Sequence, residues 1–125
     1  MTENEISYHI RGKIIYVYNQ LGPGLLESAY SAVLEYELAK CGLNIKREVP
    51  VPLVYKNIKL ATGYRIDLLI ENKVLVEVKS IDQIHDVHHK QVITYLKLAN
   101  LKLGLLVNFN TADIMSSIYR KVNGL

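Results

Sequence analysis

Apolar residues recur at helical spacing over the first forty positions of the chain. The first stripe predicts a helix over residues 2–20, with Thr2 and Glu5 as a capping box at its start. A Gly-Pro-Gly sequence then breaks this helix. The second stripe predicts a helix over residues 26–41, which Gly42 ends as a C-cap. Two helices are therefore expected before any strand.

Beyond residue 44 the pattern becomes that of strands. Residues 45–55 are rich in β-branched side chains, and their two prolines indicate an edge or irregular strand in a first hairpin that turns at Lys56 and Asn57. The remaining predicted elements are a second hairpin over residues 65–79, a helix over 83–99, a buried strand over 103–109 and a short strand over 117–122. The order ααβββαβ(β) predicts an α/β or α+β fold, with helices on both faces of a mixed β-sheet.

Length and composition limit the class of protein. A chain of 125 residues has room for one compact domain, so a single domain over residues 1–125 is expected. Half of the residues are apolar and 22% are charged, which is typical of a soluble globular protein. No transmembrane segment or secretory signal is visible, which predicts a cytoplasmic protein with no membrane partner. Cys41 is predicted to be a core thiol, and the net charge of +3 slightly favours a polyanionic partner.

The charged residues of the second hairpin indicate its register. A three-residue loop that pairs Ile70 with Val74 separates apolar from charged side chains, whereas a two-residue loop would mix them on both faces. One face then carries only apolar side chains, those of Ile66, Leu68, Ile70, Val74, Val76 and Val78. The other face carries Arg65, Asp67, Leu69, Leu75, Glu77 and Lys79. In this register Asp67 lies directly across from Glu77.

Two carboxylates opposed across a β-ladder repel each other, because their β-carbons lie about 4.5–5.5 Å apart. A divalent cation between Asp67 and Glu77 would remove this repulsion. Mg²⁺ takes one or two protein carboxylates and completes its octahedron with waters and phosphate oxygens, and Mn²⁺ accepts the same oxygen ligands. Lys79 is then placed to orient or deprotonate an attacking water, or to neutralise charge on a phosphoryl group. The alternative is a cross-strand cluster of salt bridges, with Arg65 included and no ligand bound.

The same three residues resemble a known family. The D-x9-E-x-K arrangement of Asp67, Glu77 and Lys79 is similar to the signature of the PD-(D/E)xK nuclease superfamily. The resemblance covers nearly the whole chain, and it implies a restriction-endonuclease-like core. Ile66 stands where the superfamily name has proline, but that position supplies no metal ligand.

A second motif lies at the start of the second predicted helix. The segment GPGLLESAY, with Gly24, Glu27 and Tyr30, resembles the motif that names the GxxExxY family within this superfamily. The resemblance implies that Glu27 completes the metal site with Asp67 and Glu77. An acidic residue in the first turn of a helix is also favoured by the helix dipole, so Glu27 has a purely structural alternative.

The third predicted helix offers further candidates. His88, Gln91 and Tyr95 share one helix face, and QVITY resembles the Q-x-x-x-Y element found in the nuclease domains of helicase-nucleases. That resemblance implies that Gln91 connects Lys79, or a metal-bound water, to the DNA backbone. His88, Tyr95 and Arg65 are candidate nucleic-acid contacts. His85 and His89 have zinc-ligand spacing, but no further ligand completes a tetrahedral site.

These features predict a Mg²⁺-dependent nuclease that acts on DNA without strong sequence specificity. Its predicted catalytic residues are Asp67, Glu77, Lys79 and Gln91. The alternative function is a nuclease-like fold that binds nucleic acid or a protein without cutting. Cleavage of both strands of a duplex usually needs two active sites, so a homodimer is expected, with an interface on the first helix formed by Tyr8, Tyr16 and Tyr18. The sequence leaves open the form of the substrate.

Overall fold

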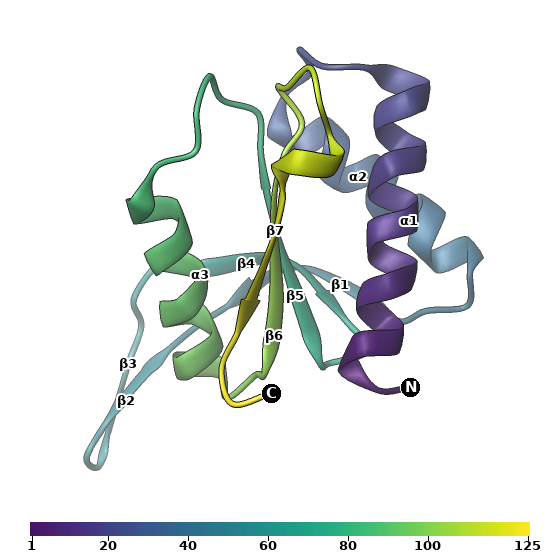
Figure 1. Cartoon of the computed structure of the whole chain (residues 1–125). Helices are drawn as coiled ribbons and strands as arrows, with labels where there is room; N and C mark the ends of the chain where they lie inside the picture. Colours follow the sequence, from purple (N-terminus) through teal and green to yellow (C-terminus); the bar gives the residue numbers. More distant parts are fainter.

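A computed structural model describes all 125 residues, and it confirms the predicted fold class (Figure 1). Helices cover both faces of a five-stranded mixed sheet with the strand order β1-β4-β5-β6-β7. Strands β5 and β6 are parallel, and the other neighbours are antiparallel. The helices are α1 (Glu3–Leu21), α2 (Glu27–Lys40) and α3 (Asp86–Ala99). The strands of the sheet are β1 (Ile45–Pro50), β4 (Arg65–Ile70), β5 (Val74–Lys79), β6 (Leu103–Asn108) and β7 (Ile118–Val122).

Each face of the sheet has its own hydrophobic core. The larger core packs α1 and α2 against the sheet, and Ile10, Leu34 and Val76 belong to it. The smaller core packs α3 against the opposite face and contains Leu75 and Val92. Alternate residues of β5 therefore serve different cores, as expected for a strand covered on both sides. No helix in the structure combines the length and the apolar character needed to cross a membrane.

The segment after β1 differs most from the sequence prediction. Residues 45–55 form two separate strands, because β1 ends at Pro50 and β2 (Leu53–Tyr55) begins after Pro52. β1 pairs with β4, while β2 pairs only with β3 (Ile58–Leu60) in a two-stranded hairpin. Proline has no N–H group to donate, which explains why the sheet pairing ends there. Five strands, and not three, thus separate α2 from α3.

Three smaller predictions also need correction. Helix α3 begins at Asp86, three residues after the predicted start. A 3₁₀ turn, η1 (Met115–Ser117), precedes β7, so the last strand starts at Ile118. Cys41 is exposed and is not a core thiol. Because α2 ends at Lys40, Cys41 caps the helix and does not continue its buried stripe.

Gly104 on β6 allows α3 to pack closely on the sheet. A β-carbon at this position would lie 2.9 Å from Leu75 Cδ1 and 3.0 Å from Val92 Cγ1, both in the buried core. We expect Gly104→Ala to lower the free energy of unfolding by about 1–3 kcal/mol, as overpacking usually does. Urea unfolding measures the effect. Gly12→Ala is the control, because nothing lies within 4 Å of that α1 position and alanine should add about 0.5–1 kcal/mol there.

Candidate active site

The regular pairing of β4 with both neighbouring strands is interrupted at Asp67. On one side, β1 pairs Arg47 with Leu68 and Val49 with Ile66, but the position between them is unpaired. On the other side, the ladder with β5 ends at the pair of Leu68 and Val76. From there to the turn the predicted register is confirmed, with Ile70 opposite Val74. Beyond Leu68 the two strands make no further ladder pairs.

Side-chain carboxylates replace the missing ladder bonds. The Asp67 N–H donates to Glu77 Oε1 over 3.1 Å, and the Val78 N–H donates to Asp67 Oδ2 over 2.8 Å. Each carboxylate thus accepts a hydrogen bond from the opposite strand. This change in pairing also affects Ile66, which joins the smaller core with Val51 and not the apolar face that contains Leu68. The prediction for Ile66 was wrong because it assumed regular alternation through Asp67.

The two carboxyl groups are costly to ionise together. Glu77 is only 3% exposed, and burial together with the charge of Asp67 raises the pKa of Glu77 to about 9. Burial likewise raises the pKa of Asp67, although its hydrogen bond from Val78 opposes that shift. A buried pair with raised pKa values is characteristic of a functional site, because a structural ion pair would lower them. The metal-free protein therefore favours a protonated Glu77 at neutral pH.

Lys79 lies at the end of β5 and is partly buried. Its positive charge lowers the pKa of both Asp67 and Glu77, but its ammonium group makes no ion pair within 4.0 Å of either carboxylate. The Phe109 N–H donates to the Lys79 carbonyl over 2.9 Å, which fixes the main chain at this position. The lysine side chain is thus close enough to lower the pKa of both carboxyl groups, but it forms no salt bridge with either of them.

Glu27 reaches the same region from the first turn of α2. The Ser80 N–H donates to Glu27 Oε2 over 3.1 Å, and Ser80 Oγ donates to the Leu25 carbonyl over 2.6 Å. Ser80 directly follows Lys79. These bonds join the start of α2 to the end of β5. Glu27 therefore faces the chain segment that carries the lysine.

Tyr30 holds the loop in front of Glu27. Its hydroxyl donates to the Gly22 carbonyl and accepts the Leu25 N–H over 3.2 Å. Its ring stacks on Phe109, with centroids 4.2 Å apart and planes 5° from parallel. Gly24 has a φ of +105°, which only glycine adopts easily. The Gly, Glu and Tyr of the motif therefore have a shared structural role, which is to place the first turn of α2.

We expect Tyr30→Phe to weaken this loop while preserving the stacked ring. The variant loses both hydroxyl hydrogen bonds and leaves the Leu25 N–H without its partner, so the free energy of unfolding should fall by about 1–2 kcal/mol. Urea unfolding measures the change. Tyr36→Phe is a matched control, because Tyr36 is on the same helix and is 63% exposed. Equal stability of the two variants would contradict a structural role for the Tyr30 hydroxyl.

A cleft of about 730 Å³ opens between the start of α2 and the strand that carries Asp67. Its lining contains two of the predicted residues and several that sequence analysis missed. The two predicted residues are Glu27 and Asp67. The missed lining residues include Ser31, Glu48, Ser80 and Asn110. The four-residue spacing of Ser31 from Glu27 was a usable signal, since it puts both on one helix face.

Helix α3 covers the face of the sheet opposite to α1 and α2, which is the face that carries Leu75. Gln91 Nε2 donates to the Tyr95 hydroxyl over 3.0 Å, so the predicted helix face is present. Burial raises the pKa of Tyr95, and the charges of Glu77 and Asp67 raise it further. Tyr95 is therefore close to the carboxylate pair.

The other predicted contacts lie outside this group. His88 Nδ1 accepts the His85 N–H over 2.9 Å, so His88 caps the start of α3. Arg65 is exposed, and its guanidinium reaches the Glu48 carbonyl at 3.5 Å. His89 packs edge-on against Tyr119, with ring centroids 4.8 Å apart. No group of three or more His, Cys, Asp or Glu side chains in the structure could hold a metal ion, which also rules against zinc at these histidines.

The carboxylate pair suits Mg²⁺, which is usually bound by one or two carboxylates and not by a closed cage of protein ligands. Glu27 does not form a three-ligand cluster with Asp67 and Glu77, and its place among the metal ligands stays a prediction. Mg²⁺ needs only one or two protein carboxylates, and it keeps its other positions for water and phosphate oxygens. Asp67 Oδ1 and Glu77 Oε2 take no part in the main-chain hydrogen bonds described above. A cation at these oxygens would also relieve the repulsion within the pair.

Comparison with known proteins agrees with this geometry. A family model described as the PD-(D/E)XK nuclease superfamily matches residues 4–121 of the chain. The chain therefore belongs to the PD-(D/E)XK nuclease superfamily. Searches of curated proteins and of solved structures gave no match. Membership in this superfamily implies a nuclease-like fold and a nucleic-acid substrate.

Proposed function

We propose that the protein is a Mg²⁺-dependent nuclease that hydrolyses phosphodiester bonds in DNA without strong sequence specificity. The observation that carries this proposal is the carboxylate pair of Asp67 and Glu77. The pairing of β4 with β1 and with β5 is interrupted at Asp67, and Lys79 lies two residues after Glu77 on β5. Local disruptions of a β-ladder are over-represented next to active sites. Of the pair, Asp67 lies on the lining of the cleft, where a ligand can reach it.

Each residue then has a chemical role. Asp67 and Glu77 would hold the cation, and Glu27 assists from the start of α2. When bound, the cation stabilises negative charge that develops on the phosphoryl group. Lys79 orients or deprotonates the attacking water and offsets charge on the phosphate. Gln91 connects this region to the nucleic-acid backbone, supported by its hydrogen bond to Tyr95.

The motif of Gly24, Glu27 and Tyr30 supports assignment to the GxxExxY family within the superfamily. The close fit of the three residues around one loop gives the motif a physical basis. A homodimer is part of the proposal, because two active sites are needed to cut both strands of a duplex. On α1, Tyr8 and Tyr16 are exposed and available for contact, whereas Tyr18 already donates to the Thr111 carbonyl.

A panel of substrates tests this function. Purified protein is incubated with Mg²⁺ or Mn²⁺ and with duplex, single-stranded, flapped and four-way DNA, and with RNA. The Asp67→Asn and Lys79→Ala variants are purified in parallel to exclude a contaminating nuclease. We expect metal-dependent cleavage by the native chain and none by either variant. Absence of cleavage by a folded protein that binds metal would favour a non-catalytic nucleic-acid-binding module.

A further inference from the structure

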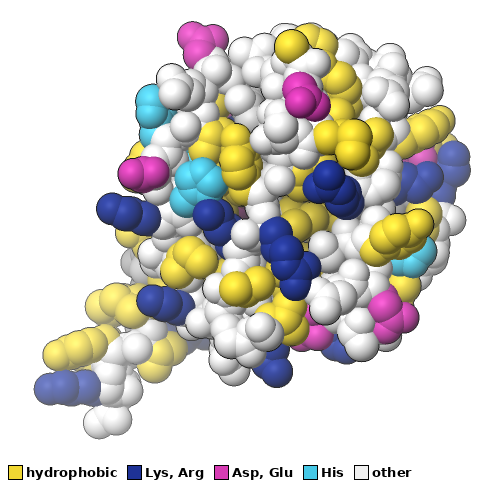
Figure 2. Space-filling model, viewed as in Figure 1, with side chains coloured by type: hydrophobic (Ala, Val, Ile, Leu, Met, Phe, Trp, Pro, Cys, Tyr) yellow, Lys and Arg dark blue, Asp and Glu magenta, His cyan; other side chains and the backbone are white.

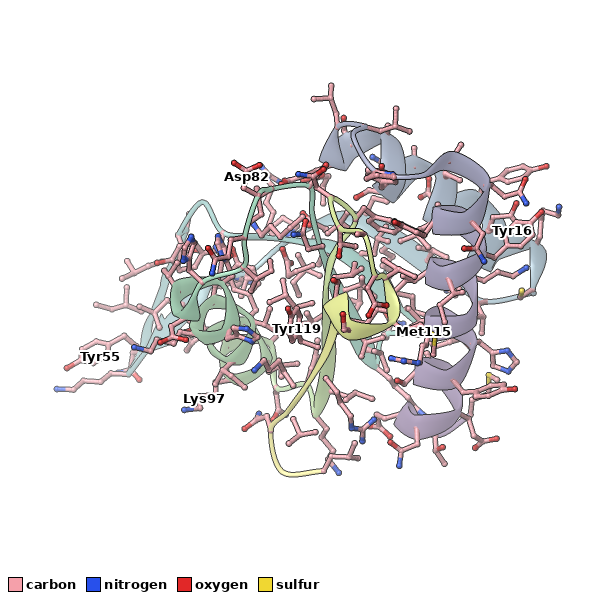
Figure 3. All side chains as sticks on the ribbon, turned by 45° about the horizontal axis from the view of Figure 1, so that its top comes forward. Tyr16, Tyr55, Asp82, Lys97, Met115 and Tyr119 are labelled. Atoms are coloured by element: carbon pink, nitrogen blue, oxygen red, sulfur yellow. The ribbon has the colours of Figure 1, made fainter.

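The β2–β3 hairpin projects from the body of the protein as an arm (Figure 1). This arm, residues 53–60, makes no ladder with the main sheet. Its strand residues Val54, Tyr55, Ile58 and Leu60 are between 46% and 66% exposed. Figure 3 shows Tyr55 at the far end of the arm, pointing away from the domain. A lone two-stranded hairpin is only marginally stable in water. Because the arm nevertheless exposes this much apolar surface, we infer that it binds a partner.

The charge of the arm favours a polyanionic partner. Residues 49–66 contain Lys56, Lys59 and Arg65 but no aspartate or glutamate, although the whole chain has 12 acidic residues. Figure 2 shows basic side chains among the apolar ones along the arm. The Lys56 ammonium lies 5.4 Å from the centre of the Tyr55 ring, so charge and aromatic surface occur together at the tip. Basic residues interleaved with tyrosines suit contact with phosphates and bases.

A second cavity lies at the base of the arm. It encloses about 430 Å³, and Lys59 and Arg65 line it with no acidic residue. Tyr64 lies on the same cavity and is 45% exposed. Arg65 precedes Asp67 by two residues on β4, a distance of about 7 Å along a strand. That distance is roughly the rise of two base-pair steps, so a strand passing the carboxylates could continue to this cavity.

We propose that the arm and the cavity at its base bind the sugar-phosphate backbone of the nucleic acid on which the Asp67 and Glu77 site acts. This inference rests on the proposed nuclease function and adds to it the surface that holds the substrate. Lys56, Lys59 and Arg65 contact phosphates, while Tyr55 and Tyr64 provide ring faces for bases or sugars. A two-stranded ribbon is narrow enough to enter the major groove of a duplex.

Binding is tested without cleavage, in the Asp67→Asn background. Fluorescence anisotropy with labelled duplex and single-stranded DNA gives the dissociation constant over a range of salt concentrations. We expect Lys56→Gln with Lys59→Gln to weaken binding roughly tenfold at moderate salt. The slope of log K against log salt should become shallower by about 1.8 for duplex and 1.4 for single strands, if both lysines contact phosphates. Arg65→Gln should reduce the slope by about half as much.

Two exposed lysines remote from the arm provide a matched control. Lys40→Gln with Lys102→Gln removes the same charge from the end of α2 and from the turn before β6, so the salt slope should stay near that of the parent. Equal slopes for the arm and control variants would overturn the inference and leave the nuclease proposal intact. If the parent binds no nucleic acid at all, the inference fails, and cleavage by the native chain decides the nuclease proposal separately.

Sedimentation distinguishes the rival occupant, a second copy of the chain. Tyr55→Ser with Ile58→Ser removes apolar surface from the arm and leaves both of its lysines in place. If this variant dissociates a dimer while nucleic-acid affinity is unchanged, the arm is a subunit contact and the inference is wrong. If nucleic-acid affinity falls and the sedimentation coefficient is unchanged, the inference is supported.

Discussion

Asp67→Asn should remove Mg²⁺ binding and lower the rate of DNA cleavage by roughly 10²- to 10⁴-fold. The substitution keeps the shape of the side chain, and the remaining oxygen can still accept the Val78 N–H. It removes the charge on which a cation would depend. Isothermal titration calorimetry measures Mg²⁺ binding, and gel assays of single-turnover cleavage measure the rate.

Lys79→Ala makes this prediction more specific. It should lower the cleavage rate by a similar factor but leave Mg²⁺ binding in place, because Lys79 lies beyond 4.0 Å from both carboxylates. Asp113→Asn, on an exposed acidic residue, and Lys97→Ala, on an exposed residue of α3 (Figure 3), are the matched controls and should change neither quantity. Loss of cleavage in Asp67→Asn with undiminished Mg²⁺ binding would show that Asp67 does not hold the metal.

The hairpin register could be predicted from sequence because it depends on parity alone. Only one loop length puts every charged residue of the two strands on one face and leaves the other face entirely apolar, and the pairing of Ile70 with Val74 follows from it. That parity also brought Asp67 and Glu77 to adjacent positions. Parity could not predict that the ladder stops there, because the side chains themselves take over the hydrogen bonds.

Other parts of the site depend on contacts between distant segments. The bond between Glu27 and Ser80 joins residues 53 positions apart, and only the motif resemblance pointed to it. Glu48 was missed for a local reason. On β1 it alternates like an ordinary solvent-facing charge, yet its φ of +54° accompanies the break in pairing opposite Asp67 and it lines the cleft. No sequence signal marks that backbone conformation in a glutamate.

For the arm, by contrast, the local sequence pattern contained enough information, but the boundary between β1 and β2 was not predicted from it. The turn at Lys56 and Asn57 was predicted and is present. The segment before it was taken as one strand, although Pro50 and Pro52 already marked an irregularity. A strand with two prolines two residues apart has lost two donors, and here the chain uses that gap to leave the sheet.

The metal-free protein should become less stable as the pH rises from about 5 to about 9. Glu77 has an unfolded-state pKa near 4.5, which burial and the charge of Asp67 raise to about 9 in the folded state. Between these values the folded protein keeps a proton that the unfolded chain releases. The folded state therefore binds more protons, and stability falls with increasing pH across this window. This is the opposite of an ordinary salt-bridged carboxylate, which stabilises at high pH.

Glu77→Gln tests the cause of this pH dependence. Glutamine keeps an oxygen for the Asp67 N–H and has no charge to desolvate, so it should raise the stability of the metal-free protein by about 1–3 kcal/mol at pH 8 and flatten its pH profile. Urea unfolding at pH 5 and pH 8 in chelator measures both effects. Asp82→Asn, on the exposed residue labelled above α3 in Figure 3, is the control and should leave the profile unchanged.

Mg²⁺ should reverse the loss of stability, because it takes the place of the retained proton. At a concentration 100 times its dissociation constant, a ligand bound only by the folded state adds about 2.7 kcal/mol. The added stability should be larger at pH 8 than at pH 5, since protons compete with the metal at the lower pH, and it should vanish in Glu77→Gln. A variant that gains stability from this substitution and loses the response to Mg²⁺ would show that the pair costs stability in order to bind metal. A loss of stability in Glu77→Gln at pH 8 would show instead that Glu77 serves the fold.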